Sequence, residues 1–290
     1  MGKRNLLVAF FLILIFVATS TPVEGIEGPL MPETKYKVYN IAHRGVPYYA
    51  PEHTMPSLEM AVEMGADFLE IDIQMTKDGT IVAMHDTTLN RTTSGMGLVR
   101  YATLRELKEL DAGSWFNEKY PEMANEKFIG LEVPTLEEIF QRFGRNINYL
   151  IEIKSPQKNP GIEEELLRLI EKHHLGARNG MSNKLVVQSF HPETLQKIYK
   201  ENPNLPLFHL LKKRASEAEL RKIATYAVGT GISGKKLSKS FVKVVKEHGL
   251  YIHTYSIDSP KQMKEAIKLG VDGIVTNYPD RLQEVLMELK

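Results

Sequence analysis

The sequence predicts a (β/α)8 barrel, and three observations indicate this fold. Strand-like and helix-like patterns alternate to give about eight strand and helix pairs in about 255 residues, which is the size and order of such a barrel. No G-x-G-x-x-G motif follows the first strand, which disfavours the alternative of an open doubly wound sheet. Charged residues fall at the carboxyl ends of several predicted strands, where barrels of this class carry their active sites.

The first 25 residues differ from the rest of the chain. Two basic residues precede an apolar run of 13 residues, Leu6–Ala18, and small and polar residues follow it. This pattern is typical of a secretory signal, and the run is shorter than the roughly 20 residues that cross a bilayer. We therefore expect residues 1–25 to be a cleaved signal peptide. The mature domain, residues 26–290, is expected to be exported to the periplasm, the cell wall or the medium, with no stable membrane partner.

The composition indicates an ordinary globular domain held together by its core. The absence of cysteine excludes disulfides and a lipid-modified cysteine. The chain has 37 basic and 36 acidic residues, and residues 1–25 contain two of the former and one of the latter, so the mature domain has a formal charge of zero. Such a balance provides no field that attracts nucleic acid. We interpret the short charge runs, such as Lys212–Arg214, as solvated surface.

The first strand and helix follow a short lead-in. Tyr36–Ala42 is predicted to be a strand, and His43 and Arg44 stand at its end. Thr54 is a plausible cap for a helix whose apolar stripe includes Leu58 and Val62.

The second predicted strand, Phe68–Met75, is the centre of the argument. Because alternate residues of a strand share a face, Glu70 and Asp72 lie about 7 Å apart on one face, and the opposite face is aliphatic and must be buried. Acids on a buried strand need a counter-charge. A turn and a short consecutive strand, Thr80–Met84, then lead to His85.

Residues 87–133 interrupt the alternation of strands and helices. They contain one short helical pattern, at Thr103–Leu110, and several aromatic residues, including Trp115, the only tryptophan of the chain. We predict an insertion that caps one end of the domain. The alternative is an unpacked excursion, which the tryptophan disfavours.

From Pro134 the alternation is regular. Helices are predicted at 135–143, 161–173, 192–201, 217–226, 238–248, 261–269 and 279–289, and strands at 148–154, 184–190, 205–210, 227–232, 250–255 and 273–276. The residues at strand ends that could carry chemistry are His43, Arg44, Glu70, Asp72, His85, Glu152, Lys154, Gln188, Phe190 and Tyr255.

Three of these residues, Glu70, Asp72 and Glu152, would converge at one barrel mouth. Unpaired, the three carboxylates would repel one another, and a divalent cation would resolve the repulsion. Internal salt bridges to Arg44 and Lys154 are the alternative. Oxygen ligands favour Mg²⁺ or Ca²⁺ over zinc or copper, and for an exported protein we favour Ca²⁺ over Mg²⁺.

The remaining charged groups indicate a phosphate ester as substrate. His43 and His85 suit a general base and a general acid, because the ordinary pKa of imidazole allows both roles at neutral pH. Arg44 and Lys154 add two fixed cations, which fit an anionic substrate whose transition state gains charge on oxygen.

These residues lie in motifs that resemble the glycerophosphodiester phosphodiesterase family. The motifs are the run IAHRGVPYYAPEHTMPSLEMAVEMGADFLEIDIQMTKDGTIVAMHD with its H-R-G, E-x-D and H-D signatures, then IEIK, QSFHPETL and GVDGIVTNYPD. The resemblance covers nearly all of the mature chain. It implies a metal-dependent barrel that hydrolyses glycerophosphodiesters to glycerol 3-phosphate and an alcohol, through a cyclic phosphate that water opens.

The resemblance also implies roles for individual residues. His43 and His85 are the acid and base pair, with the order left open, and Arg44 and Lys154 bind the phosphate. The metal ligands are the carboxylates of Glu70, Asp72 and Glu152; substrate contacts are expected from Gln188, Phe190 and Tyr255; and Glu52 is expected to support the site or the metal.

Two departures from the family pattern concern His53 and Asp258. The family's P-E-N-T reads Pro-Glu-His-Thr here, so His53 replaces the asparagine, and any role of the asparagine amide in the family is in doubt for this chain. Asp258 also replaces an asparagine of the family pattern, a change expected to alter only a loop hydrogen bond. The expected substrates are deacylated phospholipid head groups and, in a cell with a poly(glycerol phosphate) wall, teichoic acid. The alternatives are a phospholipase D-like or C-like barrel that acts on intact lipid, and a non-catalytic surface protein that binds phosphate-containing ligands.

Overall fold

Eight parallel strands form a closed barrel in the computed structural model, which describes residues 31–32, 36–177 and 181–289. The barrel closes because β1 pairs with β2 on one side and with β9 on the other. The predicted (β/α)8 fold is confirmed, and an open sheet is wrong. The signal peptide expected at residues 1–25 lies outside the described residues. The barrel strands are β1 (Tyr39–His43), β2 (Phe68–Met75), β4 (Asn148–Ile153), β5 (Leu185–Ser189), β6 (Leu207–Leu211), β7 (Gly229–Ser233), β8 (Tyr251–Tyr255) and β9 (Gly273–Thr276).

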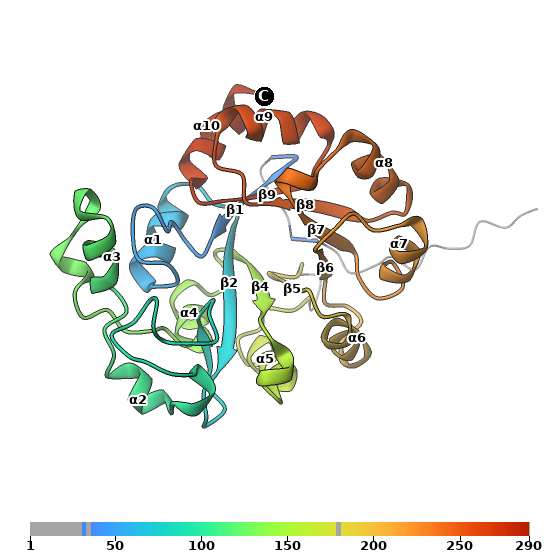
Figure 1. Ribbon diagram of the computed structural model, residues 1–290. Helices are drawn as coiled ribbons and strands as arrows, with labels where there is room; N and C mark the ends of the chain where they lie inside the picture. Colours follow the sequence, from blue (N-terminus) through green and yellow to red (C-terminus); the bar gives the residue numbers. More distant parts are fainter. Residues whose placement is uncertain (1–30, 33–35, 178–180, 290) are drawn as a thin grey trace, which may run out of the picture.

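Helices surround these strands, as Figure 1 shows. None of the helices in the described stretches is long and apolar enough to cross a membrane. The helices that follow barrel strands, or precede one after the insertion, are α1 (Met55–Glu63), α4 (Leu136–Phe143), α5 (Ile162–Lys172), α6 (Pro192–Glu201), α7 (Glu217–Ile223), α8 (Lys239–Glu247), α9 (Pro260–Leu269) and α10 (Pro279–Glu288).

Helix α1 differs from its prediction in two details. Thr54 stands at the N-cap position, but its hydroxyl donates to the carbonyl of Pro51 (2.7 Å) and does not cap the helix. Val62 is 36% exposed, whereas Ala61 is fully buried beside Leu58. Residues three or four positions apart lie on the same face of a helix. In α1 the buried pair is Leu58 and Ala61, three positions apart, rather than Leu58 and Val62, four positions apart.

The core has two layers, which follow the alternation of the strands. The outward residues of β2, Leu69, Ile71 and Ile73, are fully buried against the helices. Inward residues fill the barrel interior, namely Ile41, Phe68, Leu150, Val186, Phe208 and Val275. The predicted separation of faces in β2 is therefore confirmed, and the acids lie on the inward face above an apolar floor.

Strand β3 (Ile81–Ala83) follows β2 in the sequence, as expected, but it does not belong to the barrel. It pairs antiparallel with β2, in a hairpin. Residues Phe68–Ile73 of β2 pair with β4, and β2 extends beyond this pairing. The hairpin therefore returns the chain to the barrel rim, where the N–H of Met84 donates to the carbonyl of Asp72 (2.9 Å). His85 reaches the site by this route.

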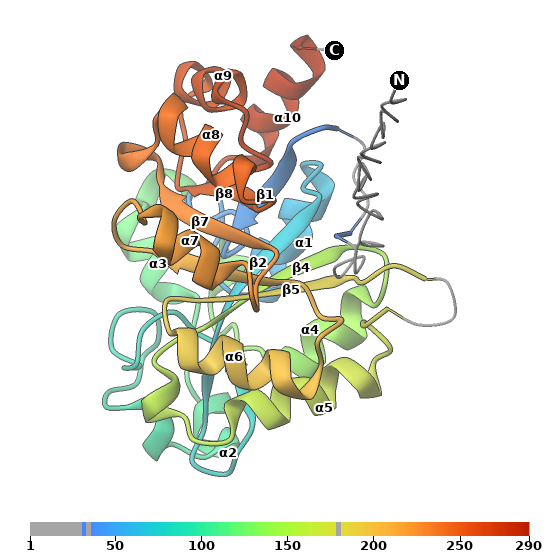
Figure 2. The same cartoon turned by 90° about the vertical axis from the view of Figure 1, so that its right-hand side faces the viewer.

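Residues 87–133 pack against the barrel beside β3. Their helices are η1 (Val99–Tyr101), α2 (Leu104–Lys108), α3 (Ser114–Lys119), η2 (Pro121–Met123) and η3 (Glu126–Phe128). Leu107 and Phe116 are fully buried, and Leu107 belongs to a small apolar cluster that includes Val82 of β3. This packing argues against an unpacked excursion. Figures 1 and 2 show α2 and α3 outside the ring of strands.

Candidate active site

The turn after β1 explains the H-R-G sequence. Arg44 and Gly45 both adopt the left-handed region (φ +57° and +86°), and a Cβ at Gly45 would collide with the backbone of α1, so glycine is required there. The turn directs Arg44 across the rim. Its backbone N–H donates to Oε2 of Glu70 (3.0 Å), and its Nε lies 3.2 Å from Oδ2 of Asp72.

The three predicted carboxylates meet at the rim. Glu70, Asp72 and Glu152 each offer an oxygen atom, and these atoms lie within 4.8 Å of one another. The side chains are almost completely buried, with exposed fractions of 2%, 1% and 8%. The parallel register of β2 and β4 pairs Asp72 directly with Glu152, which is why acids so far apart in the sequence adjoin.

More cationic and polar side chains contact Asp72 than either of the other two acids. Its carboxylate lies 3.0 Å from Nε2 of His53 and 3.6 Å from Nζ of Lys154. Burial would raise the pKa of Asp72, but the hydrogen bond from His53 and the charges of Lys154 and Arg44 outweigh it and hold the pKa well below its usual range. The salt bridges that the sequence left as an alternative are present, and they concentrate on Asp72.

Glu70 and Glu152 are not compensated in the same way. Burial and the charge of Asp72 raise the pKa of Glu70 well above its usual value and that of Glu152 to about 7, although Nζ of Lys154 lies 2.7 Å from Oε1 of Glu152. Two cations therefore do not neutralise three buried acids. A set of carboxylate oxygens that retains this repulsion fits a divalent cation such as Ca²⁺ or Mg²⁺.

The two histidines have different partners. Nδ1 of His43 lies 2.7 Å from the amide oxygen of Asn277, and Nδ1 of His85 lies 2.6 Å from a carboxylate oxygen of Asp86. Burial, followed by the charge of Arg44, lowers the pKa of His43 to about 4. Burial also lowers the pKa of His85. His43 therefore faces a neutral acceptor and His85 an anionic one.

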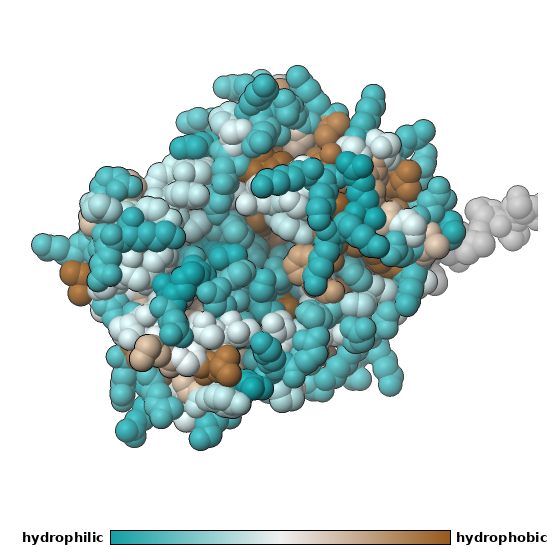
Figure 3. Space-filling view, in the orientation of Figure 1, coloured by the Kyte–Doolittle hydropathy of each residue, from teal (hydrophilic) through white to brown (hydrophobic). Residues whose placement is uncertain are grey.

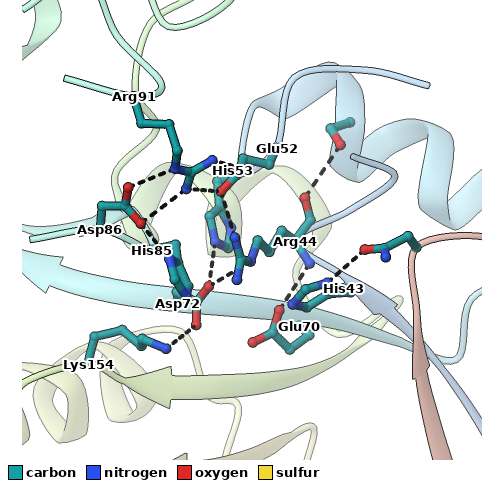
Figure 4. Close-up of polar contacts among 12 residues, drawn as sticks. His43, Arg44, Glu52, His53, Glu70, Asp72, His85, Asp86, Arg91 and Lys154 are labelled. Carbon is teal, nitrogen blue, oxygen red and sulfur yellow. Dashed lines mark hydrogen bonds and ion pairs between the residues drawn. The ribbon is translucent and has the colours of Figure 1, made fainter. Parts of the chain in front are cut away.

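A chain of ion pairs links His85 to Arg44, as Figure 4 shows. Arg91 bonds Asp86 through Nε (2.7 Å) and Glu52 through Nη1 (2.7 Å) and Nη2 (2.8 Å), and Glu52 accepts from Nη1 of Arg44 (3.0 Å). Burial of Glu52 is outweighed by Arg91 and Arg44, which lower its pKa to about 2. Glu52 thus holds Arg44 in place and does not belong to the carboxylate trio.

A cavity of about 250 Å³ opens among these groups. Every predicted site residue lines it except Asp72 and Glu52. The amide oxygen of Gln188 is buried and has no hydrogen-bond partner among the described residues. The rings of Phe190 and Tyr255 pack edge to face, with their centres 6.2 Å apart. The cavity therefore has an aromatic wall, made by these two rings, and a polar wall, made by the charged residues and Gln188.

Sequence reasoning did not assign four residues that the structure brings to the site, His53, Asp86, Arg91 and Asn277. His53 occupies the position whose role was in doubt, and it supplies a ring nitrogen to Asp72 (3.0 Å) in place of an amide. Asn277 follows β9 directly, so the criterion of position at a strand end would have found it. Arg91 lies in the insertion, where no pattern indicated it.

Comparison with known proteins identifies the family. The sequence profile of the glycerophosphoryl diester phosphodiesterase family matches residues 43–281. The chain belongs to this family. It is therefore a phosphoric diester hydrolase, in agreement with the resemblance seen in its motifs.

Relatives of this phosphodiesterase cover almost its whole length. A glycerophosphodiester phosphodiesterase of Bacillus subtilis (strain 168) is 44% identical, over 98% of this chain and 99% of the relative. One from Caldanaerobacter subterraneus subsp. tengcongensis is 35% identical, over 85% and 96%. Among solved structures, a phosphodiesterase of Oleispira antarctica in complex with the product sn-glycerol-3-phosphate has a TM-score of 0.73 and 27% identity, and covers 85% of this chain and 96% of that one.

Proposed function

We propose that this enzyme hydrolyses glycerophosphodiesters to sn-glycerol 3-phosphate and an alcohol, with a divalent cation bound by Glu70, Asp72 and Glu152. One observation carries the proposal: both histidines, both cationic side chains and two of the three acids line one cavity of about 250 Å³. The family and the product in the Oleispira enzyme support the substrate class. A bound cation would act as a Lewis acid on the phosphate oxygens.

The chain's own residues account for the proton transfers. His43, which is neutral at physiological pH, removes the proton of a glycerol hydroxyl, whose oxygen forms a bond to phosphorus. His85 protonates the alcohol oxygen as its bond to phosphorus breaks, and Asp86 stabilises the charged form of that ring. Arg44 and Lys154 offset the charge on the phosphate. A water then opens the cyclic phosphate, with the two histidines exchanging roles.

Product formation tests the proposal. Purified enzyme is incubated with glycerophosphocholine and glycerophosphoethanolamine in the presence of Ca²⁺, Mg²⁺ or a chelator, and glycerol 3-phosphate is measured. We expect product from both diesters with a cation, more with Ca²⁺ than with Mg²⁺, and none with chelator. Binding of these diesters without product under any condition would instead support a non-catalytic phosphate-binding protein.

Cation affinity is expected to rise with pH through the neutral range. At lower pH, Glu152 and Glu70 carry protons that the cation must displace, because in the cation-free site the pKa of Glu152 is about 7 and that of Glu70 is raised well above its usual value. Titration calorimetry with Ca²⁺ at several pH values, from about 5.5 to about 8.5, measures the trend. An affinity that is independent of pH over this range would contradict it.

Poly(glycerol phosphate) is a second candidate substrate, and a cationic extension of the site favours it. Lys212 and Lys213 line a cavity of about 360 Å³ that shares Phe190 with the catalytic cavity, and Nζ of Lys212 lies 5.9 Å from the centre of the Phe190 ring. Among the described residues no carboxylate lies within ion-pair distance of either lysine, and Glu219, which lines the same cavity, interacts with Lys213 at longer range. Such lysines suit the next phosphate of a polymer.

The double variant Lys212→Gln/Lys213→Gln is therefore expected to raise KM for poly(glycerol phosphate) about fivefold or more and to leave KM for glycerophosphocholine unchanged. The variant Lys239→Gln/Lys243→Gln, on α8, is the charge-matched control. Equal effects of the two double variants on the polymer would point to net charge alone and exclude this second phosphate site.

Intact phospholipid is a less suitable substrate. The face drawn in Figure 3 is largely hydrophilic, and its hydrophobic areas are small; a lipid-binding surface would need a continuous apolar patch. We also propose that the enzyme is exported, on the basis of its first 25 residues. Sequencing the N-terminus of the enzyme recovered outside the cell tests this, and an intact Met1 on such material would exclude cleavage.

A further inference from the structure

Behind His43 lies a hydrogen-bond chain that the mechanism above does not use. Asn277 follows β9, and Asp258 lies in the loop between β8 and α9. The side-chain nitrogen of Asn277 donates to Oδ2 of Asp258 (2.8 Å), and its backbone N–H donates to Oδ1 of Asp258 (2.9 Å). The amide oxygen of Asn277 lies 2.7 Å from Nδ1 of His43. The three side chains thus form a line from the loop to the rim.

The chemistry of these partners allows one arrangement of protons. An ionised carboxylate only accepts hydrogen bonds, so Asp258 requires the NH₂ group of Asn277 to face it. The amide oxygen then faces His43 and can only accept. Nδ1 of His43 must therefore carry the proton, which leaves Nε2 without one and able to act as a base.

We propose that Asp258 is a positioning residue that sets the tautomer of His43 through the amide of Asn277. It touches no reacting atom. The inference about hydrogen-bond order stands on the geometry, whereas its consequence for turnover rests on the proposed role of His43 as the base. From the sequence, Asp258 in place of the family's asparagine was expected to alter only a loop hydrogen bond. In this proposal it orients the amide of Asn277.

The intervening amide also distinguishes His43 from His85. Asp86 bonds directly to His85 and offers the protonated ring a negative partner. Asp258 is separated from His43 by a neutral amide, so the tautomer of His43 is set without a carboxylate at hydrogen-bond distance on Nδ1. This arrangement suits a group that accepts a proton in one step and returns it in the next.

The variant Asp258→Asn tests the proposal, because it should reverse the chain. The side-chain oxygen of the introduced amide would still accept from the backbone N–H of Asn277, so its NH₂ group would occupy the position of Oδ2 of Asp258. The amide of Asn277 must then rotate and present NH₂ to His43, which moves the ring proton from Nδ1 to Nε2. We expect kcat to fall about 10–100-fold with KM little changed.

Long-range ¹H–¹⁵N NMR of the full chain saturated with Ca²⁺ reports the tautomer directly, and the His43 signals are assigned by their loss in His43→Ala. The wild type is expected to show the Nδ1–H form and Asp258→Asn the Nε2–H form. The exchanged variant Asp258→Asn/Asn277→Asp has an acceptor facing His43 again and should recover both the Nδ1–H form and most of kcat. A purely structural role of Asp258 would not produce this reversal and recovery.

Asp280→Asn is the matched control, since Asp280 accepts from the hydroxyl of Tyr49 (2.9 Å) and lies outside the chain of hydrogen bonds; it should change neither tautomer nor kcat. An unchanged tautomer in Asp258→Asn would overturn the proposal, as would a changed tautomer with unchanged kcat. Failure of the proposed function appears differently: the wild type would release no glycerol 3-phosphate, while the NMR result would still decide the hydrogen-bond order.

Discussion

Replacement of His43 by alanine is expected to lower kcat for glycerophosphocholine about 10³-fold, because it removes the proposed base for the glycerol hydroxyl, the ring that the amide of Asn277 orients in the catalytic cavity. His85→Ala should cause a similar loss, since it removes the proton donor for the leaving alcohol. Release of glycerol 3-phosphate measures both. His248→Ala, at the end of α8, serves as the histidine control and should retain full activity.

The leaving group separates the roles of the two histidines. A glycerophosphodiester of p-nitrophenol releases a stable anion that needs no proton, so it should restore most of the activity of His85→Ala and little of that of His43→Ala. Recovery in His43→Ala instead would reverse the assignment of acid and base. Near-full activity of either alanine variant with glycerophosphocholine would remove that histidine from the mechanism.

Glu70→Gln is expected to abolish measurable cation binding and turnover while making the cation-free protein more stable. The substitution replaces one of three buried, mutually repelling carboxyl groups by a neutral amide, which can still accept from the backbone N–H of Arg44. Since burial and the charge of Asp72 raise the pKa of Glu70 above its value in the unfolded chain, this side chain destabilises the cation-free fold at neutral pH. We expect Tm in chelator to rise by about 2–4 °C.

Glu163→Gln provides a matched buried control for this experiment. Glu163 is 7% exposed and accepts from Thr194 (2.8 Å) and Lys197 (3.2 Å), away from the cavity. It should lose some stability and keep cation binding, the opposite of Glu70→Gln. Calorimetry with Ca²⁺ and thermal melts in chelator give both readouts. Unaltered Ca²⁺ affinity in Glu70→Gln would exclude Glu70 as a ligand.

Local pattern was sufficient wherever one periodicity dominates a segment. The alternation in Phe68–Met75 placed the acids and the aliphatic residues on the correct faces, and the strands 148–154 and 273–276 appear within one residue of their predicted limits. Local pattern was insufficient for β3, because the apolar run Ile81–Ala83 fits a barrel strand and a hairpin strand equally well. Only the pairing partner distinguishes them, and that partner is chosen by long-range packing.

From the chain alone came the barrel class, the inward acids, and the residue types that suit phosphate ester chemistry, because these depend on spacing along one strand at a time. Tertiary structure decided which groups touch. Glu52 bonds Arg44 and Arg91, and His53 bonds Asp72. Asp258 and Asn277 form a hydrogen-bond chain to His43. Hydrogen bonds act over about 3 Å, and contacts at that distance between separate loops are determined by barrel closure, which sequence spacing does not encode.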